Sequence, residues 1–474
     1  MNFNSYEFVL LFLPLTIVVY LWMGKQKNYQ LSKISLLMAS LFFYGIYEWK
    51  LLLFIVGDVC INYLFFLWIK KTRCKRASLM ITIVLNLVPL IYFKYYNFMV
   101  DSINLMFETE FSIRELIVPL GISFITFQQI GFLLDTYHGE TLNYSILEYA
   151  LFICSFTHVT SGPIITHNQF FPELKNKNSY KVNWENMATG IYMFAMGLGK
   201  KVLIADVLGK AVDWGYANVS ELNSISAFFV MIAYSLQIYY DFSGYCDMAM
   251  GIGKMLNLKL PVNFNSPYKA VNILEFWKRW HITLTNFLTR CLYIPLGGNR
   301  KGKKRTFINT MIVFLCSGIW HGASWTFVLW GFLHGCAMII NKRFYTTIEK
   351  IPRTICWMGT FIFINFSWIL FRANSFTIFK KFIGALFLGG GELHSSICDN
   401  FIHLYGVHIT MINESLFSWI YIGCVLIATI GCKNVQEKAC NLKWNICSVF
   451  FTAIILILSV LSFSNVTTYI YSGF

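Results

Sequence analysis

The segment "SGIWHGASWTFVLWGFLHG" occupies residues 317–335 and holds two histidines amid two apolar runs, 306–320 and 323–341. Such runs recur along the whole chain of 474 residues, of which 57% are hydrophobic and 13% are charged. Soluble proteins carry about 25% charged residues. Repeated apolar runs of nearly 20 residues are instead typical of helices that cross a bilayer. We therefore predict an all-α polytopic integral membrane protein.

Basic loops indicate the orientation of these helices. The loops 25–33 and 70–76 are basic, and so is the loop 432–443 near the other end of the chain. All three are predicted to face the cytoplasm, because short cytoplasmic loops are enriched in lysine and arginine. The segments then predicted to lie outside are the N-terminus, the acidic loop 101–115, the segment 389–415, which lacks lysine and arginine, and the tail 464–474.

Composition also excludes several classes of partner and cofactor. The net charge of +15 comes largely from these loops, so the predicted partners include anionic membrane lipids or an anionic ligand, and not nucleic acid. The 13 cysteines show no CxxC spacing, so we predict no metal site and no permanently bound cofactor. The first apolar run, 8–22, follows Glu7 and not a basic stretch, so it is predicted to be a retained helix and not a signal peptide.

The middle of the chain breaks the regular alternation of spans and loops. Residues 262–305 have moderate hydropathy and many basic residues, and they are predicted to form short or re-entrant helices with a cytoplasmic loop. Irregular backbone at membrane depth must be covered by protein or by a water-filled cavity. We therefore predict roughly ten to twelve spans around a central polar cavity. A single membrane-embedded domain is expected over 1–474.

Ionisable and polar groups inside apolar segments are candidates for function because their insertion is costly. In the stretch 119–140, Gln128 and its neighbours Gln129 and Asp135 suit either hydrogen bonding between helices or contact with a substrate. In the stretch 155–174, His158 and His167 are predicted to lie at the membrane interface rather than in a catalytic site.

The stretch 236–256 contains two aspartates that are six residues apart. That spacing does not place Asp241 and Asp247 on one face of a helix, so a catalytic carboxylate pair has weak support. Asp241, with Tyr240 and Ser243, is predicted to line or brace a cavity.

The stretch 276–335 collects three histidines, His281, His321 and His334, among several tryptophans. His321 stands out because the glycines at 318 and 322 would let another backbone or a thin ligand approach closely. The neighbouring Trp320 and Trp325 suit the wall of a narrow tunnel. His334 lies within a regular helical run and is predicted to hydrogen-bond to a neighbour.

This stretch resembles the membrane-bound O-acyltransferase family, in its bacterial branch of alginate and peptidoglycan O-acetyltransferases. The resemblance rests on "FWKRWHITL", "YIPLGGNRKG" and "SGIWHGASWTFVLWGFLHG". It extends to "FNSYEFVLLFLPL", "PLGISFITFQ", "SGPI", "GLGKKVLIAD", "YYDFSGYCDMAMGIGKML" and "SWILFRA", and so covers residues 1 to about 375, followed by C-terminal helices over 376–474. The family's usual Arg-Asp before "YIPLGG" is Thr289-Arg290 here, so the salt bridges of that loop are not carried over.

The resemblance implies a helical bundle pierced by a tunnel, in the cytoplasmic membrane of a bacterium. It implies that His321 is the essential histidine, that His281 is the second, and that acetyl-CoA is the acyl donor. It also implies a separate extracytoplasmic SGNH-type partner that places acetyl groups on a polysaccharide, because this chain contains no serine nucleophile elbow of its own.

A histidine suits this chemistry because burial disfavours the charged imidazole, and a neutral imidazole can take a proton from an attacking hydroxyl. The alternative of a transient acyl-imidazole stays open. The basic run with Arg300, Lys301, Lys303, Lys304 and Arg305 suits the phosphates of coenzyme A, and it equally suits anchoring of a cytoplasmic loop.

Two rival functions remain at this stage. One is transfer of D-alanine from a carrier protein to teichoic acid, by a sister branch of the same family. The other is a conduit or scaffold without covalent chemistry, in which His321→Ala would leave acetylation intact. The polysaccharide that receives the acetyl group is not specified by the sequence.

Overall fold

The computed structural model describes residues 1–46, 48–402, 414–463 and 469–470, and every regular element within these ranges is a helix. Six described helices are long and apolar enough to cross a membrane: Glu7–Lys25, Trp49–Lys71, Lys75–Phe107, Ser224–Met255, Arg353–Arg372 and Glu414–Gly431. The predicted all-α membrane class is therefore confirmed.

By length and hydropathy, the described residues contain six candidate spans, which is fewer than the predicted ten to twelve. The apolar run predicted over 144–160 forms only a nine-residue helix, because the chain leaves the helix after Cys154. The apolar helix Ile446–Leu461 has 16 residues, which is short for a bilayer about 30 Å thick. The predicted orientation stays a prediction, and both its outside segment 389–415 and its tail 464–474 fall partly outside the described residues.

The chain divides into two compact units. Among the described residues, unit 1 contains Met1–Phe194 and Cys246–Val262, and unit 2 contains Ala195–Tyr245 and Asn263–Ile470. The single membrane-embedded domain expected from the sequence stays a prediction.

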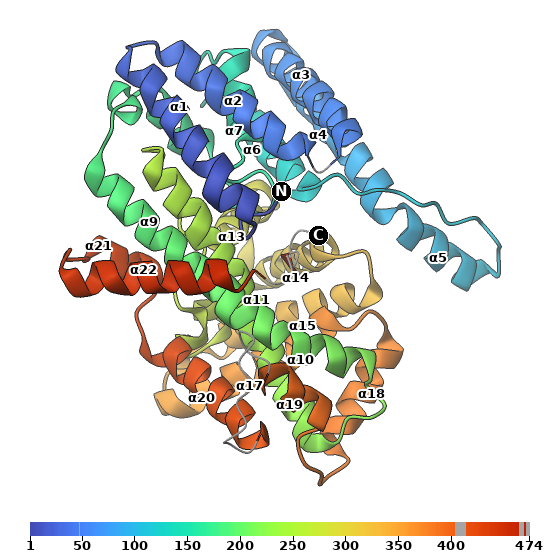
Figure 1. Cartoon of the computed structure of the whole chain (residues 1–474). Coiled ribbons are helices and arrows are strands. Elements are labelled where there is room, and N and C mark those ends of the chain that lie inside the picture. Colours follow the sequence, from blue (N-terminus) through green and yellow to red (C-terminus); the bar gives the residue numbers. More distant parts are fainter. Residues whose placement is uncertain (47, 403–413, 464–468, 471–474) are drawn as a thin grey trace. The chain divides into compact units, whose positions relative to one another are not determined.

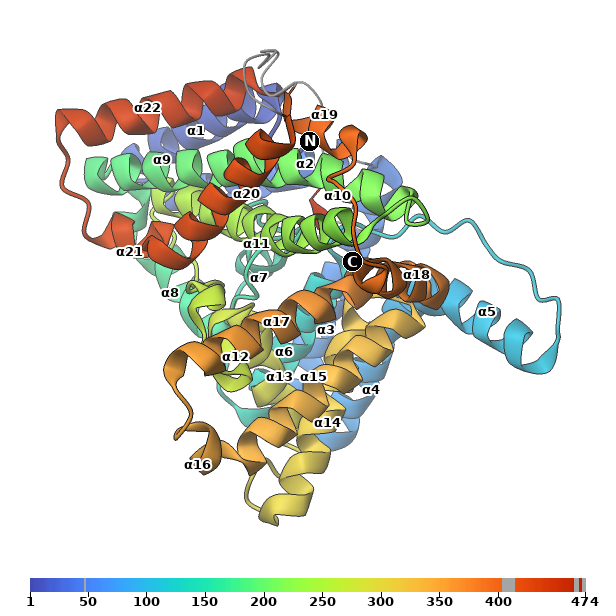
Figure 2. The ribbon, with the colours of Figure 1, turned by 90° about the horizontal axis from the view of Figure 1, so that it is seen from below.

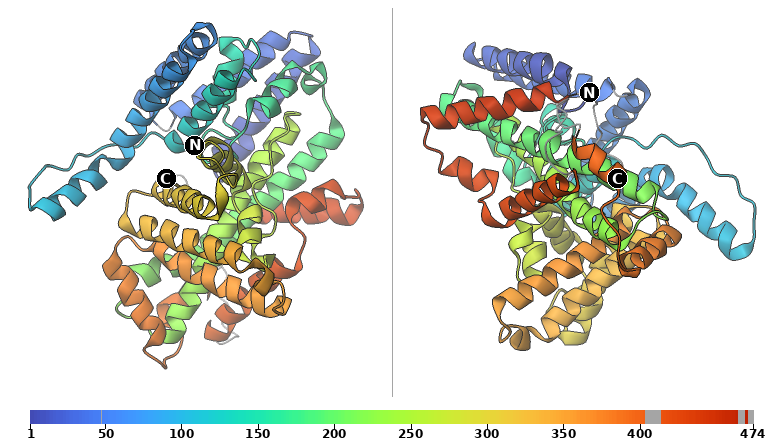
Figure 3. Two further views of the ribbon diagram at one scale, coloured as in Figure 1. Left: turned by 180° about the vertical axis from the view of Figure 1, so that it is seen from behind. Right: turned by 60° about the horizontal axis from the view of Figure 1, so that its bottom comes forward.

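Unit 1 is a bundle of helices from the first part of the chain (Figure 1). Its helices are α1 (Leu13–Lys25), α2 (Tyr29–Gly45), α3 (Trp49–Lys71), α4 (Lys75–Leu90), α5 (Tyr96–Phe107), α6 (Ile122–His138), α7 (Ile146–Cys154), α8 (His167–Lys175) and most of α9 (Trp184–Gly199). Rings of Phe8, Phe43 and Phe156 meet in its core at centroid distances of 5.8–6.2 Å. Figure 3 shows α5 extending away from the other helices of this unit.

Unit 2 holds the remaining helices, together with most of the long helix α11. They are α10 (Asp206–Ala217), α11 (Ser224–Met255), α12 (Ile273–Arg279), α13 (Ile282–Leu288), α14 (Gly302–His321), α15 (Trp325–Arg343), α16 (Tyr345–Ile348), α17 (Arg353–Arg372), α18 (Phe376–Phe387), α19 (Ser395–Ile402), α20 (Glu414–Gly431), α21 (Val435–Cys440) and α22 (Ile446–Leu461). The short helices predicted over 262–305 are confirmed, since α12 and α13 have seven residues each.

The helices α14 and α15 lie side by side, and together they carry most of the segment 317–335 (Figure 2). Gly318 of α14 faces the backbone of α15, where an added Cβ would lie 2.4 Å from the Phe327 carbonyl oxygen. Gly331 of α15 faces the backbone of α14 in return, with an added Cβ 2.4 Å from the Phe314 carbonyl oxygen. Small residues at such a crossing let two helix backbones approach closely.

Candidate active site

His321 is the last residue of α14 and is buried, with 1% of its surface exposed. Three aromatic rings surround its imidazole, those of Trp320, Trp330 and Phe371, at centroid distances of 4.9, 5.2 and 5.1 Å. Trp330 comes from α15 and Phe371 from α17. Three helices of unit 2 therefore hold this histidine in an apolar environment.

His281 is the residue immediately before α13 and is fully buried. Its backbone φ of +45° lies in the left-handed region, which histidine enters more readily than most residues and which costs about 1–3 kcal/mol. Its Nδ1 lies 3.1 Å from Oδ1 of Asn263, and that oxygen also accepts hydrogen bonds from the backbone N and Oγ1 of Thr283. An amide oxygen only accepts, so this contact places the proton on Nδ1 and a lone pair on Nε2.

The two histidines lie close together although 40 residues separate them. Their ring centroids are 6.4 Å apart, and the ring of Trp320 lies 6.0 Å from that of His281. Burial lowers the pKa of His281 to about 3, so its imidazole is neutral at physiological pH. The structure thus brings His321, His281 and Trp320 into one cluster.

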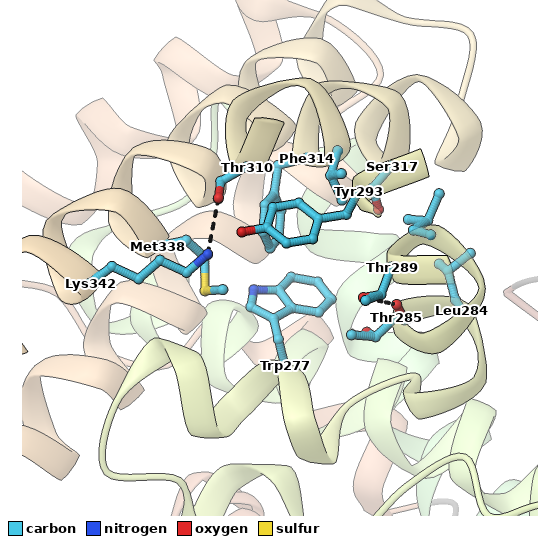
Figure 4. A pocket seen from close by; sticks show the side chains of 12 residues that line it. Trp277, Leu284, Thr285, Thr289, Tyr293, Thr310, Phe314, Ser317, Met338 and Lys342 are labelled. Atoms are coloured by element: carbon cyan, nitrogen blue, oxygen red, sulfur yellow. Dashed lines mark hydrogen bonds between the residues drawn. The ribbon is translucent and has the colours of Figure 1, made fainter. Parts of the chain in front are cut away.

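A cavity of about 150 Å³ lies within unit 2; residues close in sequence to the cluster line it, whereas His281, His321 and Trp320 do not (Figure 4). Its wall includes Ser317, one turn before His321 on α14, and Leu284, three residues after His281. The wall is mainly apolar, and it carries the hydroxyls of Thr285, Thr289 and Thr310. Lys342 of α15 also lines it and donates a hydrogen bond of 3.0 Å to Thr310 Oγ1.

A second hollow of about 320 Å³ shares Lys342 with this cavity. Its wall also contains Lys303, Arg343 and Thr306, so it is strongly basic. The predicted basic residues Arg300, Lys301, Lys303, Lys304 and Arg305 are all exposed at the start of α14. Lys342 was missed by the sequence analysis, because nothing in its helical run separates it from an ordinary basic helix end.

The glycines beside His321 have a packing explanation. Gly318 lets the α15 backbone approach, and an added Cβ on Gly322 would lie 2.1 Å from the ring of Phe327. The sequence left open whether these glycines admit another backbone or a thin ligand. For Gly318 the structure shows the close approach of another backbone. Trp325, expected in a tunnel wall, is the first residue of α15 and is 49% exposed.

The predicted bracing residues of α11 belong to a buried ionic cluster of unit 2. Asp241 Oδ1 accepts a hydrogen bond of 2.6 Å from Lys201 Nζ, which also lies 2.9 Å from Asp206 Oδ1. The other oxygen of Asp241 accepts from the backbone N of Ile470 at 2.8 Å. Ser243 Oγ accepts from Lys200 Nζ at 3.3 Å. These contacts fit bracing of the α11 backbone to its neighbours.

The remaining polar residues singled out in the sequence lie in different settings. Gln128 is buried in unit 1 and its amide nitrogen donates to the carbonyl oxygen of Phe152. His158 lies in the turn after α7 and His167 at the start of α8, and both are buried in the same unit; their expected position at the membrane interface stays a prediction. His334 Nε2 lies 3.0 Å from Ser367 Oγ, which confirms the predicted hydrogen bond to a neighbour.

The chain is similar to known membrane-bound acyltransferases. The model of the membrane-bound O-acyltransferase family matches residues 36–380. The chain is 40% identical over 425 residues to a peptidoglycan O-acetyltransferase of Helicobacter pylori, and the match covers 82% of this chain and 81% of that protein. The chain belongs to the membrane-bound O-acyltransferase family.

Other relatives carry different names. A probable alginate O-acetylase of Pseudomonas aeruginosa is 34% identical over 400 residues, which cover 82% of this chain and 75% of that protein. A teichoic acid D-alanyltransferase of Streptococcus thermophilus is 26% identical over 293 residues, which cover 56% of this chain and 69% of that protein. The predicted family, O-acyltransferase class and multi-pass membrane character are confirmed.

Proposed function

We propose that this membrane-bound O-acyltransferase takes an acetyl group from cytosolic acetyl-CoA and passes it across the membrane for O-acetylation of an extracytoplasmic polysaccharide. The observation that carries the proposal is the pair of buried histidines, whose ring centroids are 6.4 Å apart, in the same unit as a mainly apolar cavity that shares the lining residue Lys342 with a basic hollow. The acetylating branch is favoured because relatives named O-acetyltransferase or O-acetylase match at 32–40% identity, against 25–26% for relatives named teichoic acid D-alanyltransferase.

The donor would enter from the basic hollow. Exposed Lys303 and Arg343, with Lys342, supply cationic donors suited to the phosphates of coenzyme A. From Lys303 to His321 the helix α14 advances 18 residues, or about 27 Å at 1.5 Å per residue. The mainly apolar cavity beside that helix suits the uncharged thioester arm of the donor.

The chemical step would be attack of a hydroxyl group of the extracytoplasmic partner, as the first acceptor of the acetyl group, on the thioester carbonyl. His321 would take the hydroxyl proton as the new C–O bond forms, and it would return that proton to the thiolate as the C–S bond breaks. His281, neutral with its proton held on Nδ1 by Asn263, would present its Nε2 lone pair to the same space. A transient acetyl-imidazole on His321 is the alternative course.

The proposed acceptor rests on the names of the relatives, and the proposed partner rests on the sequence, which contains no serine nucleophile elbow. Peptidoglycan and alginate are the polymers in those names, so an extracytoplasmic polysaccharide is the proposed final acceptor. We propose a separate SGNH-type protein outside the membrane as the enzyme that places the acetyl group on it. The proposed location is the cytoplasmic membrane of a bacterium, with the basic hollow facing the cytoplasm.

The test is label transfer in inverted membrane vesicles that contain this chain and its partner. Acetyl-labelled coenzyme A is added outside, and label is measured on the partner or the glycan. We expect labelling with the wild type and a loss of at least a hundredfold with His321→Ala. The control is His138→Ala, because His138 is an exposed histidine at the end of α6 and its replacement should leave labelling unchanged.

Equal labelling by the wild type and His321→Ala would favour a conduit or scaffold without covalent chemistry. Labelling only from a D-alanyl carrier protein would favour the sister branch. Hydroxylamine-sensitive label on the chain itself, lost in His321→Ala, would favour the acetyl-imidazole.

A further inference from the structure

A second group of titratable side chains lies in unit 1, where the helix α6 ends. Asp135 belongs to the last turn of α6, Glu140 follows that helix, and His167 is the first residue of α8. Each side chain offers one nitrogen or oxygen atom, and these three atoms all lie within 4.8 Å of one another. His167 Nε2 is 3.3 Å from Asp135 Oδ2. Two carboxylates and one imidazole therefore bring their ligand atoms close together.

The end of α6 creates this convergence. Gly139 adopts a left-handed φ of +79°, which reverses the chain immediately after the helix. The backbone N of Glu140 then donates a hydrogen bond of 2.9 Å to the carbonyl oxygen of Asp135. This C-terminal turn brings the Glu140 carboxylate back beside the carboxylate that the helix itself carries.

The far side of the His167 ring is held as a metal ligand's ring would be. Its Nδ1 lies 3.4 Å from the hydroxyl of Tyr144, and the Tyr144 ring stacks on Phe171 at 3.7 Å. Metal-bound histidines usually direct the nitrogen that is not bound to the metal to such a polar partner, which sets the ring orientation and the tautomer. Here Nε2 points toward the carboxylates while Nδ1 is engaged elsewhere.

The burial of the group suits a bound cation. Asp135 is 2% exposed and His167 is 1% exposed, whereas Glu140 is exposed to solvent. Two carboxylates and one imidazole thus place oxygen and nitrogen ligand atoms within reach of a single divalent cation, at the edge of the buried interior of unit 1. The absence of metal expected from the sequence rested on cysteine spacing, which does not test for histidine–carboxylate sites.

We propose that Asp135, Glu140 and His167 bind one divalent transition-metal ion, of which zinc best suits an imidazole with two carboxylates. The ion would tie the end of α6 to the start of α8 across the intervening α7, and water would complete its coordination. This site is separate from the proposed acyl transfer, whose histidines lie in unit 2.

The test is zinc binding by the full-length protein purified in detergent. The protein is first stripped with a chelator, then given zinc, and bound metal and melting temperature are measured after free metal is removed. We expect one zinc per chain and a higher melting temperature with zinc. Glu140→Ala removes an exposed ligand, so the chain should still fold, and zinc affinity should fall at least tenfold. Glu110→Ala, another exposed glutamate of unit 1, is the matched control and should bind zinc normally.

The second variant is Tyr144→Phe, which keeps the stacked ring and removes only the hydroxyl beside His167 Nδ1. Loss of such a supporting group lowers metal affinity by about 10- to 100-fold. A wild-type protein that retains no zinc and melts at the same temperature with zinc and with chelator would overturn the proposal, leaving His167 and Asp135 as a buried pair. Equal zinc binding by wild type and Glu140→Ala would overturn the assigned ligands. Because the readout is metal binding, neither result depends on acyl transfer.

Discussion

The close approach of α14 and α15 can be tested by adding one methyl group at Gly318. In Gly318→Ala the new Cβ would lie 2.4 Å from the Phe327 carbonyl oxygen and 3.1 Å from Gly331 Cα. To restore even a 3.0 Å contact with the oxygen, the two backbones must separate by 0.6 Å, and an ordinary contact of 3.4 Å needs 1.0 Å. Both neighbours are backbone atoms, so no side-chain rotation can relieve the contact.

Two consequences follow from this displacement. Overpacking of a well-packed helix pair costs about 1–3 kcal/mol, so the melting temperature in detergent should fall. His321 lies three residues further along α14 and must move with it, and a misplacement of about 1 Å at a reacting group can lower a rate on the order of 10²-fold. We therefore expect acetyl transfer per folded protein to fall by about a hundredfold.

The assay is label transfer from acetyl-coenzyme A in vesicles, normalised to the amount of folded protein. The matched control is Gly359→Ala in α17, where an added Cβ meets no atom within 4 Å. It should transfer acetyl groups at the wild-type rate, and its stability should be equal or slightly higher because alanine favours helix more than glycine does. A Gly318→Ala protein with wild-type rate and melting temperature would refute the argument that this crossing positions His321. An equal loss in both variants would show that the effect is not specific to the crossing.

Three further predictions rest on other contacts. Asn263→Leu removes the hydrogen-bond acceptor of His281 Nδ1 and should lower the acetyl-transfer rate about tenfold or more, whereas Asn263→Asp keeps an acceptor and should retain most of the rate. Equal transfer rates in the two variants would contradict the argument that Asn263 sets the tautomer of His281. Lys201→Met leaves Asp241 buried without its cation, which should destabilise the fold by about 3–5 kcal/mol and lower the melting temperature. An unchanged melting temperature would show that this ion pair does not stabilise the fold. Lys303→Gln should raise the KM for acetyl-CoA with little change in kcat, and an unchanged KM would leave this basic run as a loop anchor.

The amino-acid sequence determined the class of this protein and its principal candidate residues. Composition and recurring apolar runs are local properties that the bilayer selects, so they indicate a membrane protein without any knowledge of packing. The motifs around His281 and His321 identified the family, and the short helices over 262–305 could be predicted from moderate hydropathy and clustered charge. Each of these inferences depends on residues that are neighbours in the chain.

Only the tertiary structure decided which distant residues meet. In the structure, the ring centroids of His281 and His321 are 6.4 Å apart, and Lys342 lines the cavity. His158 and His167 are buried in the interior of unit 1. The structure also showed that Gly318 serves a helix crossing, which the sequence left undecided between a backbone and a ligand. The physical reason is that periodicity and hydropathy describe which face of a helix is apolar, whereas the partner of that face is selected by packing between segments far apart in the chain.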